Sequence, residues 1–284
     1  MTIREALAEG RTALRGCDTD TPHLDASLLL AHACGTSRER IYMELPEILE
    51  SKRLELYRGM LKRRVSGEPV AWITGIREFW GLEFSVGPGV LTPRPDSEIL
   101  VESALEFMKK MERRLSRKGR LHDCCTGPGT LALSLASERP SWKVSASDIS
   151  EEAALYFRKN NQKLADSRAE YIHADLLEGI EDTYDIIVSN PPYLTPAETD
   201  DRMALGWKEP ELALNGGGID GLKLMRRLIP RIYSRLNPRG AVLIEADPLQ
   251  MPIIKQILSD NGFKRRFLRQ DLAGRDRVIS AVKE

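Results

Sequence analysis

The C-terminal part of the chain alternates between short apolar segments and amphipathic segments, and this alternation is the strongest constraint on its fold. Amphipathic segments with helical spacing between β-branched apolar segments are typical of a parallel sheet covered by helices on both faces. We therefore expect an α/β fold after Pro95. The predicted strands lie near Arg120–Cys124, Lys143–Ser147, Glu170–His173, Tyr184–Ser189, Ala241–Glu245, Lys264–Leu268 and Val278–Val282. The predicted helices lie near Ser97–Leu115, Leu131–Glu138, Glu151–Leu164, Gly221–Leu236 and Leu249–Asn261.

The N-terminal part of the chain has a different pattern. Between Ile3 and about Arg64 apolar residues recur at helical spacing, which predicts a small helical bundle. Between Ile76 and Leu91 aromatic and β-branched residues alternate, which predicts a β-hairpin. We expect a helical domain over residues 1–75, a hairpin linker over residues 76–92 and an α/β domain over residues 93–284.

Composition narrows the class of protein. The 284 residues include 42 basic and 42 acidic side chains, so a net charge of zero gives no reason to expect broad affinity for nucleic acid or anionic membranes. The 4 cysteines and 4 histidines lack the spacing of a metal site. No signal peptide and no apolar run long enough to span a bilayer is evident. We expect a cytoplasmic protein with no metal and no membrane partner.

A rigid polar loop follows the predicted strand Tyr184–Ser189. Its residues are Asn190, Pro191, Pro192 and Tyr193. The Asn190 carboxamide oxygen and the carbonyl groups beside Pro191 can accept hydrogen bonds from a planar NH₂ group. The two prolines restrict the backbone, and Tyr193 offers a flat face. The loop therefore predicts a clamp for a planar nitrogen, with a strand-terminating turn as the alternative.

A glycine-bearing turn follows the predicted strand Arg120–Cys124 and opens a helix. Its residues are Cys125, Thr126, Gly127, Pro128 and Gly129. Such a turn lets a nucleotide-like ligand approach the backbone closely. A tight turn without a ligand is an equally good interpretation of these residues alone.

Carboxylates follow the next two predicted strands. Asp148 could accept hydrogen bonds from both hydroxyl groups of a ribose, or it could cap the following helix, a role for which Ser150 competes. Asp175 could accept from an adenine amino group while Leu176 packs on the ring, and capping is again an alternative.

The glycine turn lacks the Gly-x-Gly-x-x-Gly spacing and the lysine of phosphate-binding loops, so a cofactor without a pyrophosphate fits better. S-adenosylmethionine is such a cofactor. A methyl donor beside a clamp for a planar nitrogen predicts N-methyl transfer.

Several segments together resemble the protein-(glutamine-N5) methyltransferases that modify peptide chain release factors. The similarity runs over most of the chain. The segments that carry it are Arg77–Trp80, Leu91–Glu98, Asn190–Tyr193, Glu209–Leu214 and Asp271–Arg277.

The resemblance implies a seven-stranded, doubly wound class I methyltransferase domain behind a helical domain that recognises the substrate. It implies a substrate glutamine in the Gly-Gly-Gln loop of a class I release factor, and S-adenosylhomocysteine as product. By position, Cys125–Gly129 would line the methionine and ribose of the cofactor, Asp148 would hold the ribose and Leu176 would contact adenine. Asn190–Tyr193 would hold the glutamine amide, and Arg94 would shape the same pocket.

Two residues of the glycine turn depart from the family pattern. The family usually has glycine at the position of Cys125 and often a small polar residue at the position of Pro128. If the backbone at Cys125 needs a positive φ, its side chain costs on the order of 1 to 2 kcal/mol and weakens cofactor binding.

Two other functions remain as alternatives from the residues. One is methylation of an exocyclic amino group of a base in DNA or RNA, because such enzymes use a similar loop. Zero net charge and the lack of a target-recognition domain disfavour it, and we expect a monomer with no direct nucleic acid partner. The other is a non-catalytic adaptor with a degenerate cofactor site.

Overall fold

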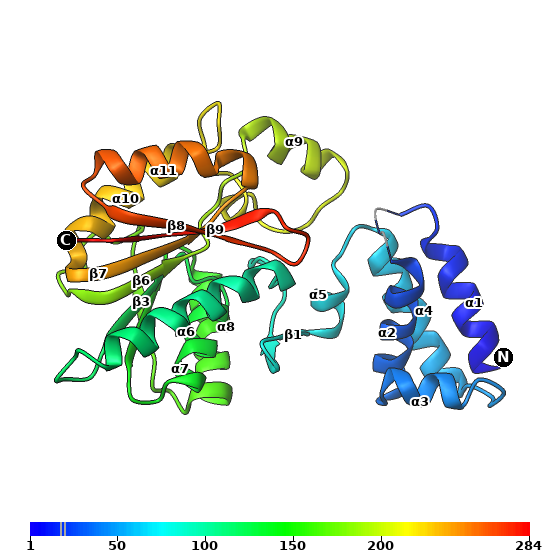
Figure 1. Cartoon of the computed structure of the whole chain (residues 1–284). Coiled ribbons are helices and arrows are strands. Elements are labelled where there is room, and N and C mark those ends of the chain that lie inside the picture. The colour runs from blue at the N-terminus through cyan, green and yellow to red at the C-terminus, as the bar shows by residue number, and fades with distance from the viewer. Residues whose placement is uncertain (18, 20) are drawn as a thin grey trace. The chain divides into compact units, whose positions relative to one another are not determined.

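The chain folds into two compact units in a computed structural model that describes residues 1–17, 19 and 21–284. One unit comprises residues 1–76 with 201–208, and the other comprises residues 77–200 with 209–284 (Figure 1). No helix among the described residues is long and apolar enough to cross a membrane.

The first unit is built from helices around its own apolar core. The helices are α1 (Ile3–Leu14), α2 (Pro22–Cys34), α3 (Arg38–Met43), α4 (Ser51–Val65) and α5 (Val70–Thr74). A capping box between Thr2 and Glu5 starts α1. The backbone of α1 approaches α4 closely at Gly10, where a Cβ atom would lie 1.8 Å from the Tyr57 hydroxyl oxygen. The predicted helical bundle is present.

The hairpin consists of β1 (Ile76–Phe79) and β2 (Leu82–Ser85). Its turn is Trp80–Gly81, and both residues have positive φ, at 54° and 67°. The paired strands therefore end well before Leu91, where the sequence pattern placed the end of the hairpin.

The second unit contains a seven-stranded sheet in the order β5-β4-β3-β6-β7-β9-β8. Its strands are β3 (Arg120–Cys124), β4 (Lys143–Asp148), β5 (Glu170–His173), β6 (Tyr184–Ser189), β7 (Leu236–Glu245), β8 (Lys264–Gln270) and β9 (Asp276–Val282). The expected α/β class and all seven strands are confirmed. A purely parallel sheet is wrong, because β9 pairs antiparallel with both β7 and β8. The short β8–β9 connection permits only an antiparallel pair.

Helices cover both faces of this sheet. Figure 1 shows α6 (Glu98–Glu112), α7 (Thr130–Glu138) and α8 (Glu151–Ala165) on one face, and α10 (Lys223–Arg235) and α11 (Met251–Asp260) on the other. Each corresponds to a predicted helix. Helix α9 (Pro196–Ala204) and the short 3-10 helices η1 (Pro95–Ser97), η2 (Glu211–Ala213) and η3 (Pro248–Gln250) were not predicted.

The parallel register places several loop starts at one edge of the sheet. Cys124 at the end of β3 lies beside Ser147 of β4 and Ser189 of β6, and β6 and β7 also run parallel. The segments that follow these strands therefore meet at the carboxyl edge, where open α/β sheets bind ligands.

Candidate active site

A cavity of about 460 Å³ opens at this carboxyl edge. It brings together most residues that the sequence singled out, namely Arg94, Cys125, Thr126, Gly127, Pro128, Asp148, Asp175, Leu176, Asn190 and Pro192. Gly129, Pro191 and Tyr193 lie next to lining residues in the chain but do not line the cavity themselves. The volume is in the range of pockets that hold small organic ligands.

The backbone of the glycine turn is left-handed at three of its five residues. Cys125 has φ 60°, Gly127 has φ 54° and Gly129 has φ 91°. At Gly129 a Cβ atom would also lie 2.7 Å from Phe157, so glycine is required there. The condition stated for Cys125 is therefore met, and its side chain is held in a conformation that costs on the order of 1 to 2 kcal/mol.

A buried asparagine that the sequence patterns did not single out holds this turn in place. Asn160 of α8 donates from Nδ2 to the Pro128 carbonyl at 2.9 Å and to the Ser85 carbonyl at 3.0 Å. Its Oδ1 accepts from the Ser85 amide at 2.7 Å. One fully buried side chain thus fastens the turn to β2.

Asp123 lies beneath the same turn and was also missed. Its Oδ2 accepts from the Thr126 hydroxyl at 2.6 Å and from the Ala132 amide at 3.1 Å. Burial raises the pKa of this carboxyl to about 7, although the hydrogen bond from Thr126 opposes the shift. Its Oδ1 has no hydrogen-bond partner in the described part of the chain. The turn is therefore anchored from below by a carboxyl that is half protonated near neutral pH.

Asp148 lines the cavity with its carboxylate fixed by backbone donors. Oδ2 accepts from the Gly127 amide at 2.8 Å, and Oδ1 accepts from the Ser150 amide at 3.0 Å. Ser150 caps α8 by accepting from the Ala153 amide, so the capping role suggested as an alternative for Asp148 belongs to Ser150. Burial raises the pKa of Asp148 against these backbone hydrogen bonds. Additional hydroxyl donors would stabilise its charged form.

Asp175 and Leu176 meet the cavity in different ways. Leu176 is 4% exposed and has φ 60°, and its carbonyl accepts from the Ser147 hydroxyl at 3.0 Å. Asp175 pairs with Arg227, which also lines the cavity, at 2.5 Å. A leucine in the left-handed region is strained, so the surrounding structure holds it there.

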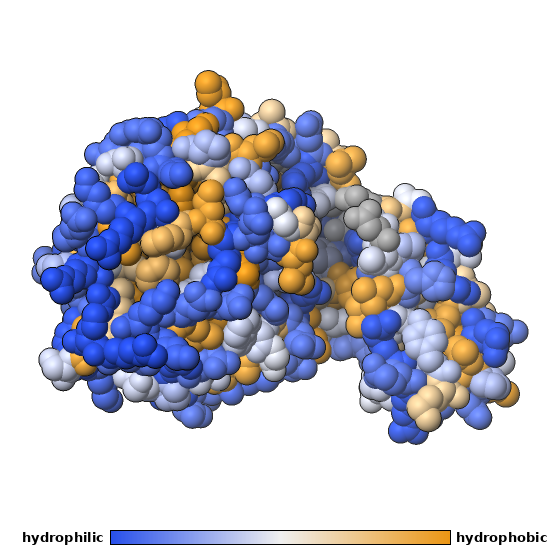
Figure 2. Space-filling view, in the orientation of Figure 1, coloured by the Kyte–Doolittle hydropathy of each residue, from blue (hydrophilic) through white to orange (hydrophobic). Residues whose placement is uncertain are grey.

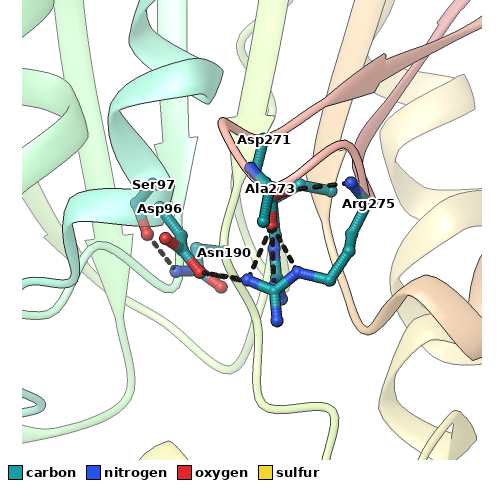
Figure 3. Close-up of polar contacts among 7 residues, drawn as sticks. Asp96, Ser97, Asn190, Asp271, Ala273 and Arg275 are labelled. Carbon is teal, nitrogen blue, oxygen red and sulfur yellow. Dashed lines mark hydrogen bonds and ion pairs between the residues drawn. The ribbon is translucent and has the colours of Figure 1, made fainter.

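The Asn190 side chain is oriented by Ser97 at the end of η1. Asn190 Nδ2 donates to Ser97 Oγ at 3.1 Å, as Figure 3 shows, and both residues line the cavity. This contact leaves Oδ1 of Asn190 available as an acceptor. The amide orientation follows from the hydrogen-bond network that surrounds it.

The backbone beyond Asn190 is braced by later segments of the chain. The Leu194 amide donates to the Leu214 carbonyl, and the Gly216 amide donates to the Leu194 carbonyl, each at 2.9 Å. Gln250 Nε2 donates to the Tyr193 carbonyl at 2.8 Å. The loop is therefore held as a fixed structure.

Tyr193 is directed toward charged groups behind the cavity. Burial, with the negative charge of Glu245 next in size, raises the pKa of Tyr193 to about 12, and Arg277 opposes the shift. Pro191 is buried. The sequence-based expectation that Tyr193 offers a flat face to a planar ligand remains a prediction.

A charged cluster ties the β8–β9 turn to the segment that holds Asn190. Figure 3 shows Asp96, Asp271, Arg275 and Ala273 with Ser97 and Asn190. Arg277 lies 3.3 Å from both Asp96 and Asp271, and Arg275 lies 3.5 Å from Asp96. Asp271 also accepts from the Ala273 and Arg275 amides at 3.0 Å. The network fixes η1 next to the Asn190 loop.

Arg94 is held by the buried carboxylate of Glu209. Glu209 Oε2 accepts from Arg94, and its Oε1 accepts from the Thr92 amide at 2.8 Å. Glu209 is 3% exposed. It thereby joins the segment around Arg94 to Pro210, and both of these segments line the cavity.

Exposed apolar side chains mark the loops at this edge of the sheet. Leu212, Ile219, Leu249 and Leu272 are all more than half exposed. They belong to the loops that follow β6 and β7 and to the β8–β9 turn. Figure 2 shows single apolar groups standing out from an otherwise mostly hydrophilic face. Apolar groups on such loops suit contact with another macromolecule.

No group of three or more His, Cys, Asp or Glu side chains able to hold a metal ion occurs among residues 1–17, 19 and 21–284. The polar groups around the cavity are those of Asp148, Asn190 and their partners. They suit hydroxyl and amide donors.

Comparison with known proteins agrees with this geometry. The family model for the PrmC N-terminal domain matches residues 5–75, and that for the methyltransferase small domain matches residues 98–208. A release factor glutamine methyltransferase of Bifidobacterium longum is 32% identical over 99% of this chain and 100% of its own length. The protein of that name from Vibrio cholerae is 36% identical over 98% of this chain and 96% of its own. The chain belongs to the release factor glutamine methyltransferase family.

This membership makes the chain an S-adenosylmethionine-dependent methyltransferase. A methyltransferase structure from Pyrococcus furiosus shares the fold, with a TM-score of 0.51 at 19% identity, over 79% of this chain and 98% of its own. The seven-stranded sheet expected from the resemblance is thus confirmed as a methyltransferase sheet.

Proposed function

We propose that this protein transfers the methyl group of S-adenosylmethionine to the side-chain amide nitrogen (N5) of the glutamine in the Gly-Gly-Gln loop of class I release factors. The observation that carries the proposal is the Asn190 amide at the cavity, with Nδ2 engaged by Ser97 and Oδ1 available to accept. The similarity to release factor glutamine methyltransferases over nearly the whole chain supports the choice of a protein amide over a nucleic acid base.

The residues around the cavity fit the cofactor. The turn Cys125–Gly129 would line its methionine and ribose, and Asp148 would accept from the ribose hydroxyl groups. Burial has raised the pKa of Asp148, so two further donors would relieve an unfavourable desolvation. Leu176 would pack on the adenine ring, and Asp175 would accept from the adenine amino group while it keeps its contact with Arg227.

The bound cofactor supplies an electrophilic methyl group, with S-adenosylhomocysteine as the product. An amide nitrogen is a poor nucleophile because its lone pair is delocalised into the carbonyl group. Asn190 Oδ1 and the Pro191 carbonyl would accept its two N–H bonds and fix the nitrogen in an attacking orientation, which can lower the barrier by several kcal/mol. These hydrogen bonds strengthen as positive charge develops on nitrogen. The methylated nitrogen is acidic and loses its proton afterwards, so no general base is assigned.

The protein substrate would extend beyond the cavity. The exposed side chains of Leu212, Leu249 and Leu272 offer apolar contacts on the loops around it. We assign recognition of the remaining release factor surface to the helical domain, residues 1–75. Arg94 and Pro192 would shape the entrance for the glutamine side chain. The enzyme is proposed to act as a monomer in the cytoplasm.

Labelled methyl transfer tests this proposal. The purified protein is incubated with methyl-labelled S-adenosylmethionine and, in parallel, with a class I release factor, ribosomal RNA or duplex DNA. Label is expected in the release factor alone. Label in RNA or DNA with none in the release factor would overturn the choice of substrate, and no transfer to any of them would favour the non-catalytic adaptor.

A further inference from the structure

Glu245 is a buried carboxyl group behind the Asn190 loop. It ends β7, and its neighbour Ile244 pairs with Ser189, the residue before Asn190. Its side chain is 2% exposed and does not line the cavity. Its Oε2 has no hydrogen-bond partner in the described part of the chain. A carboxyl so placed is costly to retain, so its contacts need a physical account.

Those contacts lead to the proposed substrate clamp. The Ser97 hydroxyl and the Asn190 amide both lie where they stabilise the ionised form of the Glu245 carboxyl. Ser97 also accepts a hydrogen bond from Asn190 Nδ2. A hydroxyl group has one hydrogen to donate, and the Glu245 carboxyl is the acceptor that this hydrogen can reach. The three side chains thus form a chain from Asn190 through Ser97 to Glu245.

The charge of Glu245 is balanced near neutral pH. Burial raises the pKa of its carboxyl to about 7, and Asp96 acts in the same direction, while Ser97, Arg277 and Asn190 lower it. Asp96 on η1, Arg277 on β9 and Tyr193 on the loop after β6 are the charged and titratable groups that face it among the described residues. Ionised and neutral forms are therefore both accessible between pH 6 and 8.

We propose that Glu245 is a positioning residue that determines which end of the Asn190 amide faces the methyl-accepting nitrogen, an inference that rests on the function proposed above. The ionised carboxylate accepts the Ser97 hydrogen, so Ser97 can only accept from Asn190 Nδ2. Oδ1 then faces the substrate and accepts its N–H bond. The Asn190 side chain performs the contact, and Glu245 acts through Ser97.

The neutral carboxyl removes this preference. It can donate its own hydrogen to Ser97, whose hydrogen then becomes free to point at Asn190 Oδ1. The reversed amide presents an NH₂ group to the substrate NH₂ group, and two donors repel each other. Methyl transfer is therefore expected to rise as pH rises from 6 to 8, although neither an amide nor a sulfonium group titrates in this interval.

Single-turnover methyl transfer to a release factor, at saturating cofactor between pH 6 and 8, tests this role in the full-length protein. In the wild type we expect the rate to increase at least threefold over this interval. In Glu245→Gln the rate should be at least fivefold below the wild type at pH 8, and its pH dependence should be lost. The dissociation constant for S-adenosylmethionine should change less than twofold.

Two further variants keep the result interpretable. Asp247→Asn removes a nearby carboxylate that caps η3, and because asparagine also caps, it should preserve both the rate and the pH profile. Ser97→Ala leaves Glu245 intact but breaks the chain, so it should also lose the pH dependence.

The outcomes separate this inference from the proposed function. A wild-type pH profile retained in either Glu245→Gln or Ser97→Ala would overturn the positioning role while leaving the methyltransferase activity established. Absence of transfer by the wild type itself would overturn the proposed function. A Glu245→Gln protein that fails to fold is recognised by its thermal melting curve, and the Ser97→Ala profile then decides the question.

Discussion

The two halves of the cavity are held in place by different means. The glycine turn depends on its backbone, with left-handed residues at Cys125, Gly127 and Gly129 and with Asp123 buried beneath it. The Asn190 loop depends on side-chain contacts from distant segments, through Ser97 and Gln250. The difference teaches that the turn shapes a ligand's surroundings, while the loop aligns one functional group. Changes in the turn should therefore alter cofactor affinity, and changes in the loop should alter the rate.

The largest expected effect comes from removing the clamp. Asn190→Ala deletes the proposed acceptor for the substrate N–H bond and leaves the turn untouched, so turnover should fall at least tenfold while cofactor affinity changes less than twofold. Steady-state kinetics with a release factor and calorimetry with S-adenosylmethionine measure the two quantities. Retained full activity would refute the clamp.

The converse effect is expected from Asp148. Asp148→Asn removes the negative charge proposed to accept the ribose hydroxyl groups, and a hydrogen bond to a charged group contributes roughly 1.5 kcal/mol or more. The dissociation constant for S-adenosylmethionine should therefore rise about tenfold, with little change in turnover at saturating cofactor. A fall in turnover without loss of affinity would remove the distinction between the two halves.

A smaller effect, of opposite sign, is expected at Cys125. Glycine adopts φ 60° without the cost that a side chain carries, so Cys125→Gly should tighten S-adenosylmethionine binding about fivefold. Titration calorimetry of the two proteins measures this difference. Equal or weaker binding by the variant would show that the strain at Cys125 is not relieved in a way that favours the bound turn.

The smallest effect concerns stability beneath the turn. The folded-state pKa of Asp123 is about 7, above its ordinary value of 3.8. Its contribution to stability is therefore fully present below pH 4 and is lost as pH rises toward 7. Relative to the wild type, Asp123→Asn should gain free energy of unfolding by about 1 kcal/mol per pH unit in this interval. Chemical denaturation at several pH values measures the difference, and a constant difference would mean that Asp123 is ionised throughout.

Much of the fold could be predicted from the sequence because its signals are local. The strands β3, β5 and β6 have the bounds that the apolar segments predicted. Helix α9 was missed because its segment, Pro196–Ala204, is short and largely polar. The direction of β9 relative to β7 depends on the packing of the whole sheet, which no local pattern contains.

The candidate site could be predicted in part for the same reason. The glycine turn, Asp148 and Asn190 each follow a recognisable strand. Ser97, Asn160 and Glu245 could not be assigned from local patterns, because their partners lie far away in the sequence. One signal was available, since Glu245 and Asp123 are carboxylates within or at the end of apolar strands, as Asp148 is.

Mass spectrometry of a class I release factor after incubation with this protein and S-adenosylmethionine tests the central claim most directly. The account predicts a single added methyl group on the glutamine of the Gly-Gly-Gln loop, and no such addition with Asn190→Ala. An unmodified glutamine, or a methyl group on another residue, would contradict it.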